Sequence, residues 1–430
     1  MREMKNSGVA WIGNIPKAWE LIRYKDKYKN SKEIAGDKSR LYERLALTLN
    51  GVIKRPKDDS DGLQPKEFDT YQVLHENDFV FKMIDLQNIS TSRVGLSPYT
   101  GLVSPAYIRF CPKNKKQYPR FIYYFLMSMY YNCVFNNLGG DGVRSALNAS
   151  DMGMLLIPYP VEIEQHSIAD YLDTACSKVN ALIANQQAQI EKLKQYKQSL
   201  ITEVVTKGLN PDVPMKNSGV EWIGMIPKHW IVKRTKFVAN ALEKGKGITK
   251  EEVISDGDIQ CVRYGEIYTK YNQGFTDCVS KTNLEIIQPH QFFEHGDILF
   301  AGTGELVEEI GKNVVYLGNE KCLAGGDIIV MKHNQNPAFL NYALNSIYSQ
   351  RQKSYGKAKL KVVHISADNI GNVKIALPPL DEQQQIATYL DDKCAKIDRL
   401  IAIKQEKIDK LNDYKKSLIY EYVTGKREVC

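Results

Sequence analysis

The sequence predicts a mixed α/β (α+β) protein: two globular domains separated by two long helices, which pair antiparallel as a coiled coil with an internal pseudo-two-fold repeat. Three observations support this fold class. A chain of 430 residues is too long for one ordinary hydrophobic core. Two segments each occur twice, and the stretches between the repeated segments do not resemble each other.

The first repeat is a short segment that precedes each globular stretch. Lys5 to Trp19 reads KNSGVAWIGNIPKAW and Lys216 to Trp230 reads KNSGVEWIGMIPKHW, so that 12 of 15 positions are identical. We call these segments the first tag and the second tag. The stretches that follow them, residues 20 to about 157 and 231 to about 376, share no alignable run. The globular parts have therefore diverged while the tags stayed alike.

The second repeat predicts the two long helices. Glu164 to Thr206 aligns without a gap on Glu382 to Thr424, with 24 of 43 positions identical. Apolar residues in both copies follow the alternating three- and four-residue spacing of a heptad seam. The seam comprises Val179, Ile183, Ile190, Leu193, Leu200 and Val204 in the first copy, and Ile397, Ile401, Ile408, Leu411, Leu418 and Tyr422 in the second. Because a single helix would leave its seam exposed, we expect the two copies to pack on each other.

Residues outside the seam are repeated as well, which predicts a docking surface that is used twice. A face that is merely solvated has no reason to keep such identities. We therefore expect two copies of one partner protein to bind there. The candidate partner-binding residues are Glu164, Gln165, Lys192, Tyr196 and Glu203 in the first copy, and Glu382, Gln383, Lys410, Tyr414 and Glu421 in the second.

Composition narrows the possible function classes. No apolar run approaches the roughly 20 residues that span a bilayer, and the N-terminus lacks the apolar core of a secretory signal, so a cytoplasmic protein is expected. The eight cysteines form no C-x-x-C pair and the seven histidines fall singly, which predicts neither a metal site nor a disulfide framework. The formal net charge of +8 is compatible with a polyanionic partner such as DNA.

Several motifs resemble the specificity subunits of type I restriction-modification systems. The run from Leu377 to Asp391, LPPLDEQQQIATYLD, is similar to the Pro-Pro-x-x-Glu-Gln-x-x-Ile-Ala-x-x-Leu-Asp opening of their helical regions. The first copy departs from this pattern, because Pro158-Tyr159-Pro160 stands where the paired prolines would be. The two tags and the stretches Phe81 to Asn88, Val103 to Tyr107 and Gly296 to Gly304 look like the same family.

This resemblance implies a non-catalytic DNA-recognition subunit in which two target-recognition domains each bind half of an interrupted DNA site. The implied parts are 1–157 and 209–376 as recognition domains, and 158–208 and 377–430 as helical spacers. The helices would set the spacing between the half-sites and dock two methyltransferase subunits, and a translocating restriction subunit is a further possible partner. No cofactor is expected in this chain. S-adenosylmethionine, and ATP with Mg if a restriction subunit joins, would be bound by the partners.

Side chains with several hydrogen-bond donors are the candidates for DNA contact, since Arg matches guanine and Asn or Gln matches adenine in the major groove. The candidates in the first domain are Lys54, Arg55, Gln87, Asn88, Ser92, Arg93 and Arg144. Those in the second domain are Arg263, Tyr264, Thr303, Lys357, Lys359 and Lys361. The three lysines alternate with other residues, so a strand would present all of them on one side to DNA phosphates.

Two other functions fit parts of the sequence. Asp297 to Gly304 has the look of a glycine-rich cofactor loop of an adenine-specific DNA methyltransferase. Such an enzyme also needs an Asn/Asp-Pro-Pro-aromatic turn, and the one Pro-Pro pair, Pro378-Pro379, lies between Leu377 and Leu380. The other alternative is a coiled-coil scaffold that binds only protein. Sequence-preferring DNA binding separates that scaffold from a specificity subunit.

Overall fold

The computed structural model describes residues 2–49, 51–59, 67–84, 86, 93–114, 116–138, 146–245, 247–286, 290–304, 309–356 and 363–429. Its internal contacts divide the chain into two units. Met1–Gln187 and Gln405–Cys430 form the first unit, and Ala188–Lys404 forms the second. Helices and strands are mixed in both units, as the sequence predicts. Among the described residues, no helix is long and apolar enough to cross a bilayer.

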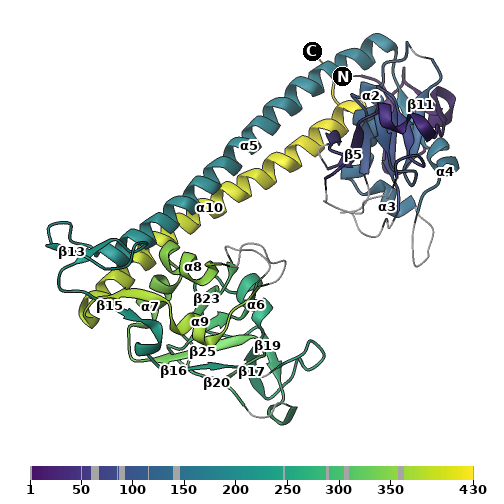
Figure 1. The fold of residues 1–430 in the computed structure, drawn as a ribbon. Coiled ribbons are helices and arrows are strands. Elements are labelled where there is room, and N and C mark those ends of the chain that lie inside the picture. Colours follow the sequence, from purple (N-terminus) through teal and green to yellow (C-terminus); the bar gives the residue numbers. More distant parts are fainter. Residues whose placement is uncertain are drawn as a thin grey trace. The chain divides into compact units, whose positions relative to one another are not determined.

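The first unit builds its globular domain on two four-stranded sheets. One strand of each, β5 and β11, is labelled in Figure 1. One sheet has the order β4 (Tyr28–Asn30), β11 (Ile108–Pro112), β8 (Phe79–Lys82) and β9 (Arg93–Leu96). The other has the order β6 (Gly51–Arg55), β5 (Arg44–Thr48), β10 (Gly101–Val103) and β7 (Gln72–Leu74). All neighbours in these sheets are antiparallel except β5 and β10, which are parallel. The short strands β3 (Glu20–Arg23) and β12 (Leu156–Tyr159) pair separately.

Aromatic side chains fill the core of this domain. Phe79 and Phe81 lie on one face of β8 and pack edge-on against Tyr24, while Val80 between them is buried in a second apolar cluster. Helix α2 (Arg120–Tyr131) is buried along most of its length and contributes Phe121 and Phe125 to the same core. The remaining helices of the domain are α1 (Tyr24–Lys27), the 3-10 helix η1 (Gly36–Leu41), α3 (Val134–Leu138) and α4 (Ala149–Gly153).

The second unit also has two main sheets. One has the order β16 (Ala239–Lys244), β25 (Ile328–His333), β21 (Ile298–Ala301), β23 (Asn313–Tyr316) and β18 (Gly274–Phe275). The other has the order β19 (Ser280–Thr282), β17 (Ile259–Val262), β24 (Cys322–Ala324) and β20 (Phe292–Phe293). Two-stranded pairs are formed by β22 (Thr303–Gly304) with β26 (Val363–His364) and by β15 (Ile231–Arg234) with β27 (Lys374–Leu377). The described helices of this domain are α6 (Tyr264–Thr269), α7 (Pro337–Leu344), α8 (Ile347–Ser354), α9 (Ala367–Gly371), η2 (Thr235–Phe237) and η3 (Leu284–Ile286).

The two globular domains share a strand arrangement, although their sequences could not be aligned. The order β6-β5-β10-β7 corresponds to β19-β17-β24-β20, and in both sheets the two central strands are parallel. The antiparallel order β4-β11-β8-β9 corresponds to β16-β25-β21-β23. The chain is therefore duplicated throughout, including the parts in which the sequence has diverged.

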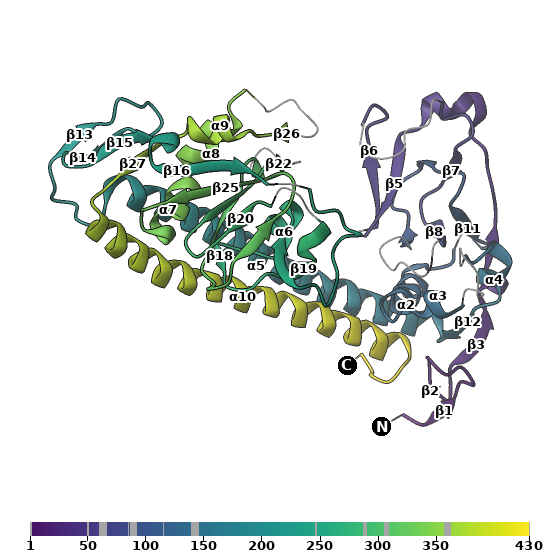
Figure 2. The same ribbon diagram turned by 90° about the horizontal axis from the view of Figure 1, so that it is seen from below.

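Two long helices, α5 (Glu162–Lys207) and α10 (Leu380–Val423), carry the second sequence repeat. Both begin just after a proline and have acidic residues in the first turn, where a carboxylate interacts favourably with the helix dipole. Helix α5 ends at Gly208, whose φ of +78° suits the left-handed cap that glycine readily adopts. Segments of the two helices lie side by side within each unit (Figure 2).

Polar residues of the helices make equivalent contacts in the two units. In the first unit, Lys415 Nζ donates to Asn180 Oδ1 at 2.9 Å. In the second unit, Lys197 Nζ lies 2.6 Å from Asp398 Oδ2. The two pairs are equivalent, because the offset of 218 residues that aligns the sequence repeats relates Lys197 to Lys415 and Asn180 to Asp398. In both units the helix segments are antiparallel. In the second unit Lys404, further along α10 than Asp398, contacts Gln189, which precedes Lys197 on α5. In the first unit Tyr422, further along α10 than Lys415, contacts Tyr171, which precedes Asn180 on α5.

Each tag forms a two-stranded hairpin that packs on helix ends within its own unit. The hairpins are β1 (Met4–Asn6) with β2 (Asn14–Pro16), and β13 (Met215–Asn217) with β14 (Met225–Pro227). The Trp19 indole N–H donates to Glu164 Oε2 at 2.9 Å, and the Trp230 indole N–H donates to Glu382 Oε2 at 3.0 Å. Both indoles are almost fully buried. The tags are therefore conserved between the two copies because they fit the conserved helices.

Candidate nucleic-acid interface

Arginines gather at one end of the β5–β6 ladder in the first domain. Arg44 and Arg55 are directly opposite each other across the two strands. Burial raises the pKa of Tyr107, and the guanidinium groups of Arg93, Arg44 and Arg55 lie close enough to oppose this rise. Like charges placed opposite each other across a ladder repel unless neighbouring groups neutralise them. We call Arg44, Arg55 and Arg93 the arginine cluster.

The structure thus brings together two predicted residues, Arg55 and Arg93, and adds Arg44, which the sequence analysis missed. Arg44 is buried at the start of a strand, where a charged side chain rarely lies without a specific reason. That unusual position is visible only when the strand and its partner are known. Arg55 has Asp59 as an ion-pair partner at 3.8 Å, which leaves its guanidinium partly exposed.

Lys54 lies on the opposite face of β6 from Arg55, since successive side chains of a strand alternate. Its Nζ is 2.6 Å from Glu43 Oε2 and lies over the Tyr99 ring. Both side chains of this ion pair are solvent-exposed, so the pair contributes little to the stability of the domain.

In the second domain, Arg263 and Tyr264 lie at the start of α6. The backbone N–H of Arg263 donates to Glu266 Oε2 at 3.0 Å, and its guanidinium lies 3.3 Å from Glu266 Oε1. The carboxylate of Glu266 thereby caps the helix and orients the arginine. Tyr264 is 40% exposed, so its ring is available for contact with a ligand.

Thr303 lies beside the same helix. Its carbonyl oxygen accepts a hydrogen bond from the Tyr268 hydroxyl of α6 at 2.8 Å, and its hydroxyl is 3.0 Å from His364 Nδ1. Thr303 pairs with His364 across the β22–β26 ladder. Helix α6 and this ladder therefore hold the described candidates of the second domain close together, and His364 is a neighbour that the sequence analysis did not identify.

Seven of the predicted DNA-binding residues lie outside the described residues. They are Gln87, Asn88, Ser92 and Arg144 in the first domain, and Lys357, Lys359 and Lys361 in the second. Their predicted roles remain predictions.

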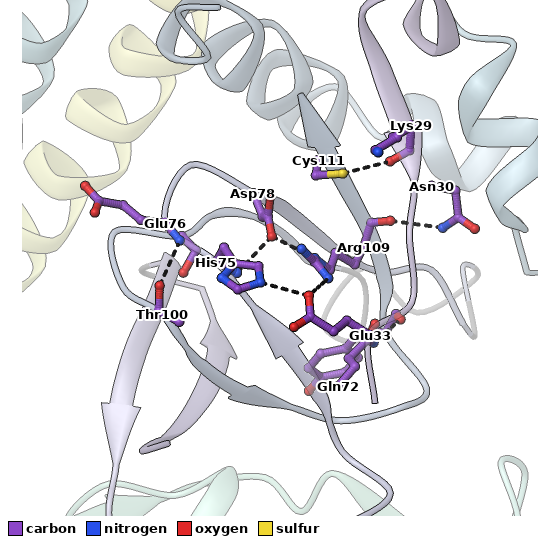
Figure 3. A network of polar contacts seen from close by, with 12 residues as sticks. Lys29, Asn30, Glu33, Gln72, His75, Glu76, Asp78, Thr100, Arg109 and Cys111 are labelled. Atoms are coloured by element: carbon purple, nitrogen blue, oxygen red, sulfur yellow. Dashed lines mark hydrogen bonds and ion pairs between the residues drawn. The ribbon is translucent and has the colours of Figure 1, made fainter. Parts of the chain in front are cut away.

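A buried polar network joins separate segments of the first domain (Figure 3). Arg109 Nε on β11 donates to Asp78 Oδ2 at 2.7 Å, and both side chains are only 4% exposed. Arg109 Nη1 and His75 Nε2 both contact Glu33 Oε2, at 3.3 and 2.8 Å. Hydrogen bonding to His75 lowers the pKa of Glu33, while burial raises the pKa of Asp78. The network links three separate segments of the domain.

Asp78 has a counterpart in the second domain. The Asp78 and Asp297 carboxylates each accept the backbone N–H three residues earlier, at 2.8 Å in both cases. The residues before them, Asn77 and Gly296, have positive φ angles of +66° and +88°. Both domains therefore share a turn that the fold requires, in which Asp precedes a buried strand whose third residue is Phe.

The glycines after this strand also have a structural role. A Cβ at Gly302 would lie 2.7 Å from the carbonyl oxygen of Asp327. The Gly302 backbone N–H donates to that same oxygen. Gly302 thus faces neighbouring backbone, which gives the glycine-rich stretch a packing explanation that needs no nucleoside cofactor.

The predicted partner-binding residues fall into two groups. Glu164, Gln165, Glu382 and Gln383 have partners inside their own units. The two glutamates bind the tag tryptophans, while the two glutamines donate to the carbonyl oxygens of the prolines that precede the helices, at 2.8 and 2.9 Å. These four residues organise the helix starts.

The second group is solvent-exposed. It comprises Lys192, Tyr196 and Glu203 on α5, and Lys410, Tyr414 and the half-exposed Glu421 on α10. The spacing of four and then seven residues places each set along one side of its helix. We call these two sets the repeated helix face.

Exposed leucines lie next to this face. Leu182 and Leu400 are repeat equivalents, and both are about half exposed. The antiparallel register puts Leu182 level with Tyr414 in the first unit, and Leu400 level with Tyr196 in the second. Each unit therefore presents one exposed leucine and one exposed tyrosine, supplied by different helices.

Comparisons with known proteins agree with this arrangement. A family model described as type I restriction modification DNA specificity domain matches residues 37–192 and 227–413. The type I restriction enzyme MjaVIII specificity subunit of Methanocaldococcus jannaschii is 25% identical over 426 residues, which cover 96% of this chain and 94% of the relative. The putative type I restriction enzyme MjaX specificity subunit of the same organism is 26% identical over 453 residues, with 97% and 96% covered.

A solved structure has the same fold. It comes from work on complex assembly and conformational transition of the type I R-M system, and it superposes with a TM-score of 0.66 at 15% identity, covering 95% of this chain and 98% of that one. The chain thus has two domains with equivalent sheets, each packed on segments of two long helices, and this is the class of protein that the DNA specificity domain model describes. Since the family model covers most of the sequence, the chain belongs to the type I restriction-modification specificity subunits.

Proposed function

We propose that each globular domain reads one half of an interrupted DNA site, while the two helices set the spacing and dock two methyltransferase subunits. In this proposal the domains are residues 1–157 and 209–376, and the helical spacers are 158–208 and 377–430. A restriction subunit that binds ATP and Mg joins the same assembly. The chain itself contributes recognition, and the chemistry on DNA belongs to its partners.

DNA recognition by both domains is supported by one strand arrangement that carries different surface residues. The first domain has the arginine cluster at the end of β5 and β6. The second has Arg263 and Tyr264 at the start of α6, and Tyr268 of the same helix donates to the carbonyl oxygen of Thr303. Because the two domains share their strand arrangement but carry different donor side chains on it, they are expected to read different base sequences.

The antiparallel coiled coil with a pseudo-two-fold axis is supported by the equivalent contacts Lys415–Asn180 and Lys197–Asp398. A two-fold relation converts each pair into the other, and no other simple symmetry does so for antiparallel helices. Such an axis presents two copies of any surface on the helices, and each copy can bind one methyltransferase subunit.

The observation that carries the docking proposal is the repeated helix face. Lys192, Tyr196 and Glu203 recur 218 residues later although they are exposed, and neither a seam nor a core explains their identity. An exposed tyrosine beside an exposed leucine is a typical centre for a protein interface, where aromatic side chains contribute much of the binding energy.

Docking is tested by counting subunits with native mass spectrometry. Tyr196→Ala and Tyr414→Ala are each expected to leave one methyltransferase bound, and the double variant none. Lys194→Ala is the matched control, because Lys194 is exposed on the same helix but is Asn412 in the second copy. A double variant that still binds two methyltransferases would refute this docking face.

Spacing is tested by lengthening both helices together. Seven residues inserted after Gln187 in α5 and after Lys404 in α10 preserve the seam and add about 10 Å, which is roughly 3 base pairs of B-DNA. Mapping of methylated bases should then reveal unchanged half-sites separated by a longer gap. An insertion in α5 alone should instead disturb helix pairing, and an unchanged gap in the double insertion would overturn the spacing role.

A further inference from the structure

A cleft in the second unit lies where α5 meets the globular domain. Its volume is about 490 Å³, and residues of α5, of the segment before β18, of the start of β23 and of α8 line it (α5, α8 and β23 are labelled in Figure 1). The described lining residues include two cations, Lys312 and Arg351, and several side-chain amides, but no carboxylate. The cleft is therefore suited to an anion.

Hydrogen bonds hold the side chains that border this cleft. Gln198 Nε2 on α5 donates to the carbonyl oxygen of Asn345 at 2.7 Å, which joins the helix to the domain. Asn345 Nδ2 donates to the carbonyl oxygen of Asn313 at 2.8 Å, and the buried Asn341 donates to Gln273 Oε1 at 3.2 Å. The walls are thus positioned without a ligand, which lowers the entropic cost of binding one.

The groups that remain available to a ligand are mostly donors. Within the described part of the chain, Arg351 and Asn272 make no side-chain hydrogen bond or ion pair, and Arg351 is exposed on α8. Because Gln273 Oε1 already accepts from the domain, its amide nitrogen is the end left for a ligand. Lys312 Nζ lies 3.4 and 3.3 Å from two backbone carbonyl oxygens. Burial lowers the pKa of Lys312, and Glu309, which does not line the cleft, opposes this shift.

A third cation lies behind the wall of the cleft. Lys353 is fully buried, and its Nζ donates to neutral oxygens of Gly311, Leu344 and Asn313 at 2.7, 2.9 and 3.2 Å. Leu344 directly precedes Asn345, so this charge lies close to the cleft. A buried charge is usually paired with an opposite charge. The described residues give Lys353 no carboxylate partner, and an anion in the cleft would supply the missing negative charge nearby.

We propose that this cleft binds a phosphoryl anion, with Arg351 and Lys312 as its charged donors and the Gln273 amide as a neutral donor. Guanidinium and ammonium groups are the side chains that bind phosphate in proteins. Free phosphate and a small organic phosphate, such as a nucleoside monophosphate, present this same group. A volume of about 490 Å³ lies in the range of pockets that hold small organic ligands.

The corresponding place in the first unit has the opposite chemistry. The repeat equivalent of Gln198 is Lys416, and the cavity that Lys416 borders is also lined by Asp409 and Asp413. Asp413 Oδ1 lies 3.1 Å from Lys416 Nζ and neutralises it. Carboxylates repel a phosphoryl group, so the chain should bind one such anion, in the second unit alone.

Isothermal titration calorimetry on the full chain tests this site with inorganic phosphate, adenosine 5′-monophosphate and adenosine. Both phosphate compounds should bind once per chain, and adenosine, which lacks the phosphoryl group, should not bind. Tighter binding of the monophosphate would identify an organic phosphate as the preferred ligand, and tighter binding of inorganic phosphate would identify the free anion. Either order supports the site.

Arg351→Gln should weaken the binding of both phosphate compounds by about tenfold or more, because a charge-assisted hydrogen bond is lost. Lys312→Gln should act in the same direction. Since Arg351 is exposed, its variant should fold normally, which a thermal melt checks even if Lys312→Gln is unstable. Lys250→Gln is the matched control, because it removes one exposed charge from the same unit outside the cleft.

Three outcomes would overturn the proposal. The first is that neither phosphate compound binds, and the second is that adenosine binds as tightly as its monophosphate. The third is equal phosphate affinity in Arg351→Gln and the unsubstituted chain. If Arg351→Gln weakened duplex DNA binding while neither small phosphate bound, the cleft would belong to a DNA interface and not to a small anion. The calorimetry uses neither DNA nor a methyltransferase, so its result is independent of the proposed function.

Discussion

Replacing Arg109 by Met tests whether the buried network of the first domain holds its strands together. Arg109 and Asp78 are each 4% exposed, and their ion pair of 2.7 Å is removed by the substitution (Figure 3). The Asp78 carboxylate still accepts the hydrogen bond from the backbone N–H of His75 at 2.8 Å, but its negative charge is left buried without Arg109 as its cation. Breaking a buried pair in this way costs about 3–5 kcal/mol. That cost corresponds to roughly 100- to 4,000-fold faster hydrogen exchange through global opening of the domain.

The assay is hydrogen exchange with mass spectrometry, because it separates the two domains. Peptides from β8 and β11 should exchange faster in Arg109→Met, and peptides from β21 and β25 should be unchanged. Lys54→Met is the matched control, since it removes an ion pair with Glu43 in the same domain that is exposed on both sides. The double variant Arg109→Met with Asp78→Asn should recover part of the loss, because Asn carries no charge.

The pH dependence gives the prediction a sign. Burial already raises the pKa of Asp78, and loss of Arg109 should raise it further. A carboxyl whose pKa is higher in the folded than in the unfolded state favours folding when protonated, and this contribution is lost as pH rises. The penalty of Arg109→Met should therefore be smaller at pH 5 than at pH 8. Equal exchange in Arg109→Met and Lys54→Met at both pH values would refute the reasoning.

Three further variants probe the second unit. Lys353 is fully buried, and burial lowers its pKa from 10.5 to about 7. Between these two values the unfolded chain binds one more proton than the folded chain, so the free energy of unfolding should rise with pH in this window. Urea melts of the Lys353→Met variant should lose this rise. Glu382→Gln removes the charge from the acceptor of the Trp230 indole and should cost about 1–2 kcal/mol, seen as faster exchange in the second tag; unchanged exchange would argue against this anchor. Gly302→Ala places a Cβ 2.7 Å from the carbonyl oxygen of Asp327 and should destabilise the domain by about 1–3 kcal/mol in a thermal melt. A variant that kept normal stability but lost S-adenosylmethionine binding would instead support the cofactor-loop interpretation.

The helices could be predicted from the sequence because their signal is local. Heptad spacing, flanking prolines and the 218-residue offset are all visible without a structure, and α5 and α10 follow them closely. The sequence also shows a lysine within each copy of the seam, Lys197 and Lys415, but it does not show which residues these lysines contact. Lys197 and Lys415 find acceptors on the opposite helix at positions that only the antiparallel register defines.

The globular domains could not be predicted in the same way, because strand order is a non-local property. Their strands are mostly three to five residues long and pair with segments far away in the chain. One short signal was available. Asn77-Asp78 and Gly296-Asp297 precede similar buried strands, and residues that tolerate positive φ before a buried aspartate indicate a common turn. Recognition of that turn would have aligned the domains.

The pattern of divergence follows from which residues the fold itself requires. Asp78 and Asp297 are kept because each satisfies a turn at the start of a central strand, although their cations differ: Arg109 in one domain and, at 3.9 Å, Lys332 in the other. At the ends of the equivalent strands no such requirement acts. There, Arg44 and Arg55 face each other in the first domain. The equivalent pair in the second domain is Cys261 and Ser280, and neither of these residues is basic. In the function proposed above, replacing the side chains at these strand ends changes the bases that are read, while the turns, the tags and the helix seam continue to determine the fold.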